Sequence, residues 1–207
     1  MVPVMRVTPL TGDLPDLPAP CGSCVFWQEP RRTVDAERKR RWSERARESS
    51  GNWGLVLWTE DRFQGLIQYG PVQLFARSRF LPAGPPSADA ALITCMWVDE
   101  DDPVGIAERL VLEALADLKS RGATAVETFA VIIEEEDRQP QHAGHRTLQD
   151  ADLLERLGFV VVRGDGAVAL MRLELGGLQP APSPAARVVE RLRNLTTARR
   201  PAPEASR

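Results

Sequence analysis

Residues 92–119, LITCMWVDEDDPVGIAERLVLEALADLK, predict a β-strand, a short turn and an α-helix in direct succession. The run 92–98 is short, apolar and rich in β-branched and aromatic residues, which is typical of a buried strand. After Pro103 and Gly105, apolar residues recur at steps of three and four, which favours an amphipathic helix that ends at Gly122. A strand, tight turn and helix in this order direct unpaired backbone N–H groups at an anion, usually a phosphate.

The composition is that of an acidic protein with enough apolar residues for a core. The chain has 207 residues, 43% of them apolar, and a formal net charge of -3. These values suit one domain with tails, and they argue against nucleic acid as the main partner, because phosphate backbones are bound by clustered Lys and Arg. No apolar run is long enough to span a bilayer, and residues 1–20 contain no signal-peptide core. We therefore expect a cytoplasmic protein with no nucleic-acid partner and no membrane partner.

The remaining elements are expected on both sides of the strand–turn–helix unit. The sequence predicts a short strand over 21–27, a helix over 33–50, a hairpin over 53–58 and 63–69, a strand over 124–133 parallel to the first, a helix that stops at 158, and a closing hairpin over 159–163 and 168–175. The fold class is therefore α/β (α+β), with a central mixed sheet and helices on both faces. We expect an extended arm over 1–19, a folded domain over 20–176, and a Pro-rich linker, short helix and disordered tail over 177–207.

This order of elements resembles the GNAT superfamily of N-acetyltransferases. The resemblance spans residues 20–175 and is carried by the strand, turn and helix over 92–121, the central hairpin, and Leu-Gly-Phe at 157–159. Residues 21–27, CGSCVFW, are similar to the Cys-x-Ser-Cys-x-Phe-Trp strand of a bacterial branch. The resemblance implies a sheet in which two parallel strands splay apart.

The resemblance also implies that acetyl-CoA is the co-substrate. An amine, on a small molecule or on a protein, would attack the thioester directly while a base or a water chain takes its proton. In the superfamily the coenzyme's diphosphate rests on the amides of the turn that opens the helix, where small residues let the backbone approach the phosphates. The matching positions here are Val104, Gly105, Ile106, Ala107 and Glu108.

The same resemblance places the pantetheine arm and suggests a base. The arm is expected along the strand edge at Met96, Trp97 and Val98, with a backbone N–H near Val98 as donor to the thioester oxygen. Glu127, in the second parallel strand, is the candidate general base, because partial burial raises the pKa of a carboxylate toward neutrality. An outward-facing strand glutamate is the alternative interpretation.

Several positions depart from the superfamily's pattern. Asp102 replaces a basic residue, and Leu154 stands where a Tyr often protonates the departing thiolate. The only tyrosine, Tyr69, is expected to have a structural role. The acidic runs 99–102 and 134–137 would favour a cationic acceptor if both face the mouth of the site. A catalytically silent binding or regulatory module with a degenerate acetyl-CoA site is therefore the main alternative. The oligomeric state stays open, with a homodimer as one option.

The cysteines and histidines allow two further interpretations. Cys21 and Cys24 could complete a tetrahedral zinc shell with His142 and His145, but the histidine spacing is short and we expect no metal. A redox dithiol is not expected either, because the Cys-x-x-Cys motif does not open a helix. Both cysteines are expected to pack in or beside the acceptor groove, and Cys95 is expected to be a small core residue.

Overall fold

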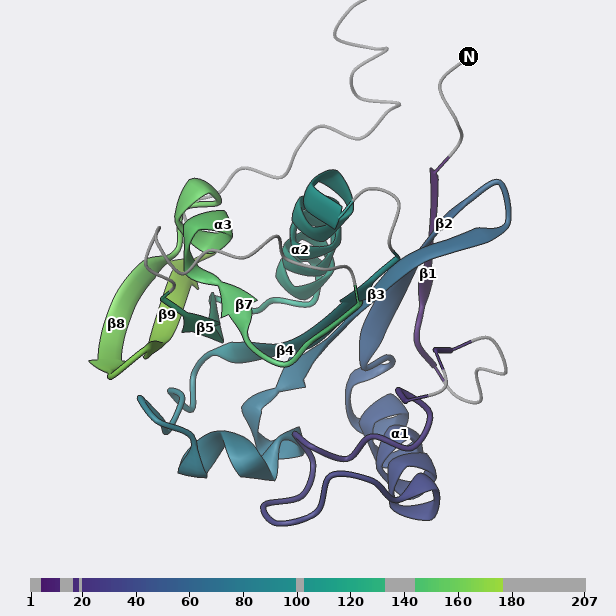
Figure 1. Cartoon of the computed structure of the whole chain (residues 1–207), viewed down its shortest axis with the longest axis horizontal. Helices are drawn as coiled ribbons and strands as arrows, with labels where there is room; N and C mark the ends of the chain where they lie inside the picture. Colours follow the sequence, from purple (N-terminus) through teal and green to yellow (C-terminus); the bar gives the residue numbers. More distant parts are fainter. Residues whose placement is uncertain (1–4, 12–16, 19, 100–102, 133–143, 177–207) are drawn as a thin grey trace, which may run out of the picture. The chain divides into compact units, whose positions relative to one another are not determined.

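A nine-stranded mixed sheet runs through the part of the chain that the computed structural model describes, which is residues 5–11, 17–18, 20–99, 103–132 and 144–176 (Figure 1). These residues belong to one compact unit, Met1–Gly176. The main strand order is β1-β2-β3-β4-β5-β9-β8, while the short β6 pairs with β4 and the short β7 pairs with β5. The bounds are β1 Met5–Pro9, β2 Gly54–Thr59, β3 Arg62–Pro71, β4 Ala91–Val98, β5 Ala125–Val131, β6 Gly144–Arg146, β7 Gln149–Asp150, β8 Val160–Asp165 and β9 Val168–Glu174.

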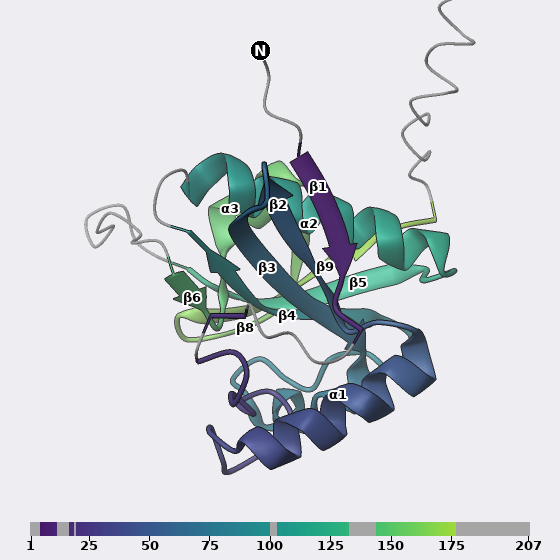
Figure 2. The same ribbon diagram turned by 90° about the vertical axis from the view of Figure 1, so that its right-hand side faces the viewer.

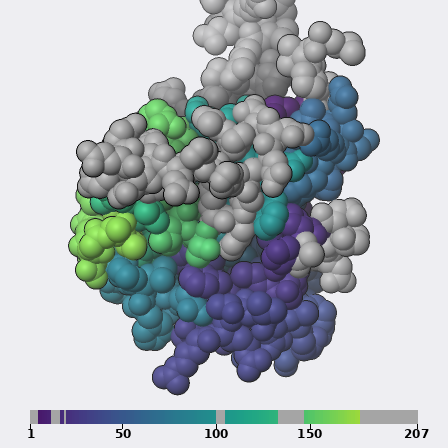
Figure 3. Space-filling model, in the orientation of Figure 1, coloured from purple at the N-terminus to yellow at the C-terminus, as the bar shows by residue number. Residues whose placement is uncertain are grey.

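Helices cover both faces of this sheet, as the sequence predicts. They are α1 (Ala36–Ser50), α2 (Pro103–Ser120), α3 (Ala151–Arg156) and two 3-10 helices, η1 (Val72–Leu74) and η2 (Ala76–Phe80). Figure 2 shows α1 on one face and α2 and α3 on the other. In the space-filling view, α1 and the N-terminal turns, coloured purple to blue, gather on one side of the molecule (Figure 3). No described helix is both long and apolar enough to cross a membrane.

Two apolar clusters hold the helices to the sheet. The predicted apolar stripe of α2 is buried against one face, and its members are Ala107, Leu110, Val111, Ala114, Leu115 and Leu118. The α1 face is dominated by large rings, which belong to Trp27, Trp42, Trp53, Phe75 and Phe129. Aromatic rings bury more apolar area than other side chains. They can therefore stabilise the packing of the N-terminal turns on this face, although these turns form no regular secondary structure.

An extra residue in β4 separates β4 from β5. Ile67 pairs with Met96 and Tyr69 pairs with Ile93, so β4 advances three residues while β3 advances two. Such a β-bulge bends the strand that carries it. The parallel pairing of β4 with β5 is correspondingly short, covering 91–93 and 126–128. Beyond the bulge, β4 pairs with β6 and β5 pairs with β7. The predicted splay of two parallel strands is therefore confirmed.

The N-terminal part of the chain differs from the prediction. Met5–Pro9, within the predicted arm, forms β1 and pairs with β2. The predicted strand over 21–27 is wrong, because the segment consists of turns with one isolated bridge, at Cys24. Pro18 and Pro20 cannot donate to a strand ladder, and their carbonyls accept from Cys21 N (2.8 Å) and Cys24 N (2.9 Å) instead. Residues 177–207 lie outside the described residues.

A close approach between α2 and the sheet depends on Gly65. A Cβ built on Gly65 would lie 2.6 Å from the Trp97 carbonyl oxygen and 3.0 Å from a Leu110 methyl carbon. We expect Gly65→Ala to lower the free energy of unfolding by about 1–3 kcal/mol, because the backbone must move to admit the methyl group. Gly164→Ala in β8 is the control, since nothing lies within 4 Å of its Cβ. It should change stability by less than about 0.5 kcal/mol in the same urea titration. Equal effects of the two substitutions would contradict the close approach.

Candidate functional site

The first turn of α2 presents backbone N–H groups beside the end of β4. The helix begins at Pro103, which has no N–H, so the N–H groups of Val104 and Gly105 are the ones in its first turn that have no acceptor within the helix. Gly105 is exposed, and without a Cβ it lets another group approach the backbone. Ile106 and Ala107 are 5% and 1% exposed and pack into the core, which fixes the turn against the sheet. The predicted diphosphate positions therefore lie together in one helical turn, and Glu108 follows them half-buried.

The acidic residues near this turn are only partly described. The Asp99 carboxylate accepts a hydrogen bond from Arg62 Nη2 at 3.1 Å, so a cation accompanies this member of the run. Residues 100–102 and the second run, 134–137, lie outside the described residues. The prediction that the two runs meet at the mouth of a site therefore stays a prediction.

The chain's own strand β6 occupies the β4 edge that the sequence predicts for the pantetheine arm. Asp99 N donates to Gln64 O, on the β3 side, at 2.8 Å. Because N–H groups alternate in direction along a strand, those of Val98 and Met96 point to the other side. There β6 pairs with β4, with Gly144 opposite Val98 and Arg146 opposite Met96. Trp97, between them, is half-buried in the α1-face cluster.

Glu127 is buried, but both of its carboxylate oxygens accept hydrogen bonds from the chain. Its side chain is 0% exposed. Oε1 accepts from Arg172 Nη1 at 3.1 Å, and Oε2 accepts from the backbone N of Ser87 at 2.7 Å. The same guanidinium pairs with Asp89 at 3.0 Å. These contacts describe a carboxylate that fixes the 87–89 connection to β9. The assignment of Glu127 as general base stays a prediction that these contacts do not support.

Tyr69 and Leu154 supply no acid for a departing thiolate. The Tyr69 hydroxyl donates a short hydrogen bond to Asp117 Oδ2 in α2. Burial, together with this hydrogen bond, raises the pKa of Tyr69 above its usual range. The expected structural role of Tyr69 is therefore confirmed. Leu154 is 0% exposed and belongs to the core.

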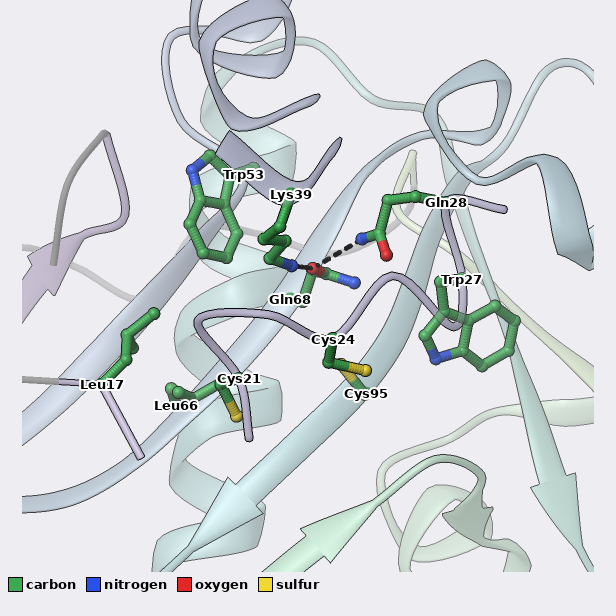
Figure 4. Close-up of a pocket in the computed structure, with 10 residues that line it drawn as sticks. All are labelled: Leu17, Cys21, Cys24, Trp27, Gln28, Lys39, Trp53, Leu66, Gln68 and Cys95. Carbon is green, nitrogen blue, oxygen red and sulfur yellow. Dashed lines mark hydrogen bonds between the residues drawn. The ribbon is translucent and has the colours of Figure 1, made fainter. Parts of the chain in front are cut away.

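A buried polar chain crosses the α1 face of the sheet and ends at the bulge. Lys39 Nζ and Gln28 Nε2 both donate to Gln68 Oε1, at 2.8 and 3.0 Å (Figure 4). Gln68 Nε2 in turn donates to Thr94 Oγ1 at 2.8 Å. From the other side of the splay, Gln149 Nε2 donates to Thr94 O at 3.0 Å. This chain of hydrogen bonds links α1, β3, β4 and β7 at the position where β4 departs from β5.

The amine of Lys39 lies in a small pocket with three thiols. It is positioned over the rings of Trp42 and Trp53, 4.5 and 4.7 Å from their centroids. Burial lowers the pKa of Lys39. Burial also raises the pKa of Cys21 to about 11 and that of Cys95 to about 12, while the Lys39 charge acts in the opposite direction. The space inside this pocket is about 10 Å³, which is room for about one water molecule.

The sequence of α1 contains a local signal for the burial of Lys39. The Arg- and Glu-rich composition of 33–50 indicates a solvated helix, yet Lys39, Trp42, Ser43 and Ala46 are buried on one face of α1. Their spacing of three and four residues is that of a buried stripe. The composition of 33–50 therefore does not indicate the buried lysine, whereas the spacing of the buried residues does.

The zinc interpretation receives no geometric support from the residues described. His142 lies outside them. Within them, no group of three or more His, Cys, Asp or Glu side chains has a geometry that could hold a metal ion. The three cysteines described are free thiols.

Several solved structures are similar to this chain. A candidate acetyltransferase from Acinetobacter baylyi ADP1 matches with a TM-score of 0.53 at 11% identity, over 87% of this chain and 98% of its own. A candidate acetyltransferase from Salmonella typhimurium, solved with acetyl-CoA, gives a TM-score of 0.49 at 16% identity, over 86% and 98% of the two chains. The ribosomal-protein-S18-alanine N-acetyltransferase from Escherichia coli gives 0.49 at 12%, over 85% and 97%. The sequence matches no protein-family model and no curated protein. The likeness to the Acinetobacter protein establishes a GNAT-like fold.

The buried Glu127 makes Arg172 important for stability. We expect Arg172→Leu to lower the free energy of unfolding by about 2–4 kcal/mol, because it leaves a buried carboxylate without its cation. Arg6→Leu is the control, since the Arg6–Asp61 pair is 53% and 92% exposed. It should cost less than about 1 kcal/mol. Chemical denaturation of both variants measures these losses of unfolding free energy. Equal losses would show that the Glu127–Arg172 pair is no stronger than a surface pair.

Proposed function

We propose that this protein is an N-acetyltransferase that moves an acetyl group from acetyl-CoA to an amine on a small molecule or on a protein. The amine nitrogen attacks the thioester carbonyl carbon, the carbon–sulfur bond breaks, and coenzyme A leaves as the amide forms. The observation that carries the proposal is the splay of β4 from β5 directly beside the N-terminus of α2, in a GNAT-like fold. An extended thioester needs a strand edge for its arm and N–H donors for its phosphates, and these two features lie side by side.

The first turn of α2 is the proposed diphosphate site. Two free N–H groups and the positive end of an 18-residue helix favour an anion there. The exposed Gly105 leaves the backbone open to the phosphates. The Arg62–Asp99 pair reduces the repulsion that Asp99 would exert on them. The favourable contributions to diphosphate binding therefore come from the backbone. No basic side chain contributes at position 102, where the superfamily has a basic residue and this chain has Asp102.

The proposed arm position requires β6 to leave the edge of β4. The strand β6 is three residues long, and only Gly144 and Arg146 face Val98 and Met96 in hydrogen-bonding positions. At about 1 kcal/mol net for each hydrogen bond, releasing β6 costs about 2–4 kcal/mol. Binding of a coenzyme can offset this cost, because the arm makes its own hydrogen bonds to the same N–H and C=O groups. Acetyl-CoA and β6 are thus competitors for one strand edge.

The second candidate function is a catalytically silent binding or regulatory module. The occupied β4 edge favours it, as does Leu154 in the core where an acid would stand. In a silent module β6 would stay on β4 permanently, and acetyl-CoA would not bind.

Calorimetry with acetyl-CoA separates these two functions. For a transferase we expect saturable binding that Gly105→Trp weakens at least tenfold, because the indole covers the amides of the first turn. Leu112→Trp is the control, since Leu112 is also an exposed α2 residue, at 44% exposure, but lies two turns from the N-terminus. Absence of binding heat at millimolar acetyl-CoA would contradict the transferase, as would equal weakening by both substitutions.

Competition between β6 and the coenzyme predicts a variant that binds more tightly. Arg146→Pro removes the backbone N–H that faces Met96 and weakens the pairing of β6 by about 1 kcal/mol or more. Acetyl-CoA should therefore bind about fivefold more tightly to this variant in the same titration. Arg146→Ala is the control, because it removes the side chain and keeps the N–H, and its affinity should match that of the natural chain. Unchanged or weaker binding by Arg146→Pro would show that the arm does not use this edge.

A further inference from the structure

All three cysteines of the chain line the pocket around Lys39, although they come from separate parts of the sequence. Cys21 and Cys24 lie in the N-terminal turns and Cys95 lies at the bulge of β4 (Figure 4). Cys21 and Cys95 are each 8% exposed. Cys24 is the most accessible of the three, with an intermediate exposure. Cys24 is therefore the cysteine of the three that is most open to a solute.

The charge of Lys39 favours an anion inside this pocket. Lys39 is 7% exposed, and its one hydrogen-bond acceptor among the described residues is the neutral amide oxygen of Gln68. The acidic groups that act on its charge in the described part of the chain are the thiols of Cys95, Cys24 and Cys21. A buried ammonium without an anion is unfavourable, and a neighbouring thiolate relieves it. Because burial raises the pKa of Cys21 and of Cys95, Cys24 is the thiol left to supply the negative charge.

Cys21 and Cys24 are the two thiols that one turn of the chain brings together, although the sequence does not predict a redox dithiol here. Cys24 N donates to Pro20 O, a hydrogen bond over four residues that closes one helical turn. Side chains three residues apart on such a turn have Cβ atoms about 5–6 Å apart. A disulfide needs about 3.8 Å, so a shift of about 1–2 Å in these turns suffices. Cys95, by contrast, is held in β4 between Ile93 and Met96, which both pair with β3.

We propose that Cys24 and Cys21 form an oxidation site for hydroperoxides, in which Cys24 reacts first and Cys21 resolves it. The Cys24 thiolate attacks the outer oxygen of the hydroperoxide, the O–O bond breaks, and sulfenic acid and hydroxide (or alkoxide) form. The Cys21 thiol then attacks the Cys24 sulfur, and its proton leaves with the displaced hydroxyl as water. In sum, two thiols and one hydroperoxide give one disulfide, one water and one alcohol, or two waters when the oxidant is hydrogen peroxide. The charge of Lys39 attracts the Cys24 thiolate, and the site does not depend on the proposed acetyl transfer.

Thiol counting on the full-length reduced protein tests this site. The protein is treated with hydrogen peroxide under native conditions, then denatured and alkylated with N-ethylmaleimide. Intact mass should show three alkyl groups before oxidation and one afterwards, and peptide mapping should place the remaining group on Cys95. Cys95→Ser is the matched control, and it should still lose both of its thiols. Cys24→Ser and Cys21→Ser should each form no internal disulfide.

A variant of the lysine tests the electrostatic part of the inference. Lys39→Met keeps the length of the side chain and its contact with the tryptophans, but removes the charge. Disulfide formation should slow about tenfold, because the thiolate loses the cation that faces it. An unchanged rate would contradict the role of Lys39. Three alkylated cysteines after peroxide, at a dose that oxidises free glutathione, would overturn the site, and so would a disulfide that includes Cys95.

Discussion

The extra residue in β4 at Thr94 and Cys95 is the constraint on which the candidate site depends. Without it, β4 and β5 would continue as a regular parallel pair, and no strand edge would open between them. The bulge ends that pairing after Ile93 and turns the next N–H groups, of Met96 and Val98, toward the gap. Because α2 follows directly, its free N–H groups lie at the end of the same strand. One local irregularity thereby places the proposed arm site and the proposed phosphate site next to each other.

The bulge is held from the α1 face by buried polar groups. Gln68 lies opposite the extra residue and connects Thr94 to the amine of Lys39. Gln149, in β7 on the other side of the splay, donates a hydrogen bond to the Thr94 carbonyl. Buried amides and amines of this kind are costly unless they are hydrogen-bonded, so they fix one arrangement of the strands. The thiol pocket shares Lys39 with this network.

The periodic elements could be predicted from the sequence, and the features that depend on distant partners could not. The apolar stripe of α2 is a local pattern, and it is buried as expected. The sequence predicts only partial burial of Glu127. Its partner Arg172 lies 45 residues away, and no local pattern indicates this pairing. The strand β6 has three residues and no alternation to recognise. The bulge depends on the register between β3 and β4, which becomes visible only when the strands are paired.

The central claim is that the splayed edge of β4 and the first turn of α2 form one acyl-CoA site. Its most direct measurement is a titration of the ¹⁵N-labelled protein with coenzyme A, followed by amide chemical shifts. The account predicts that the amides of Met96 and Val98 shift together with those of Gly105 and Ile106, with one dissociation constant. If coenzyme A shifts neither group, or only amides at the opposite end of the sheet, the site proposed for these residues is contradicted.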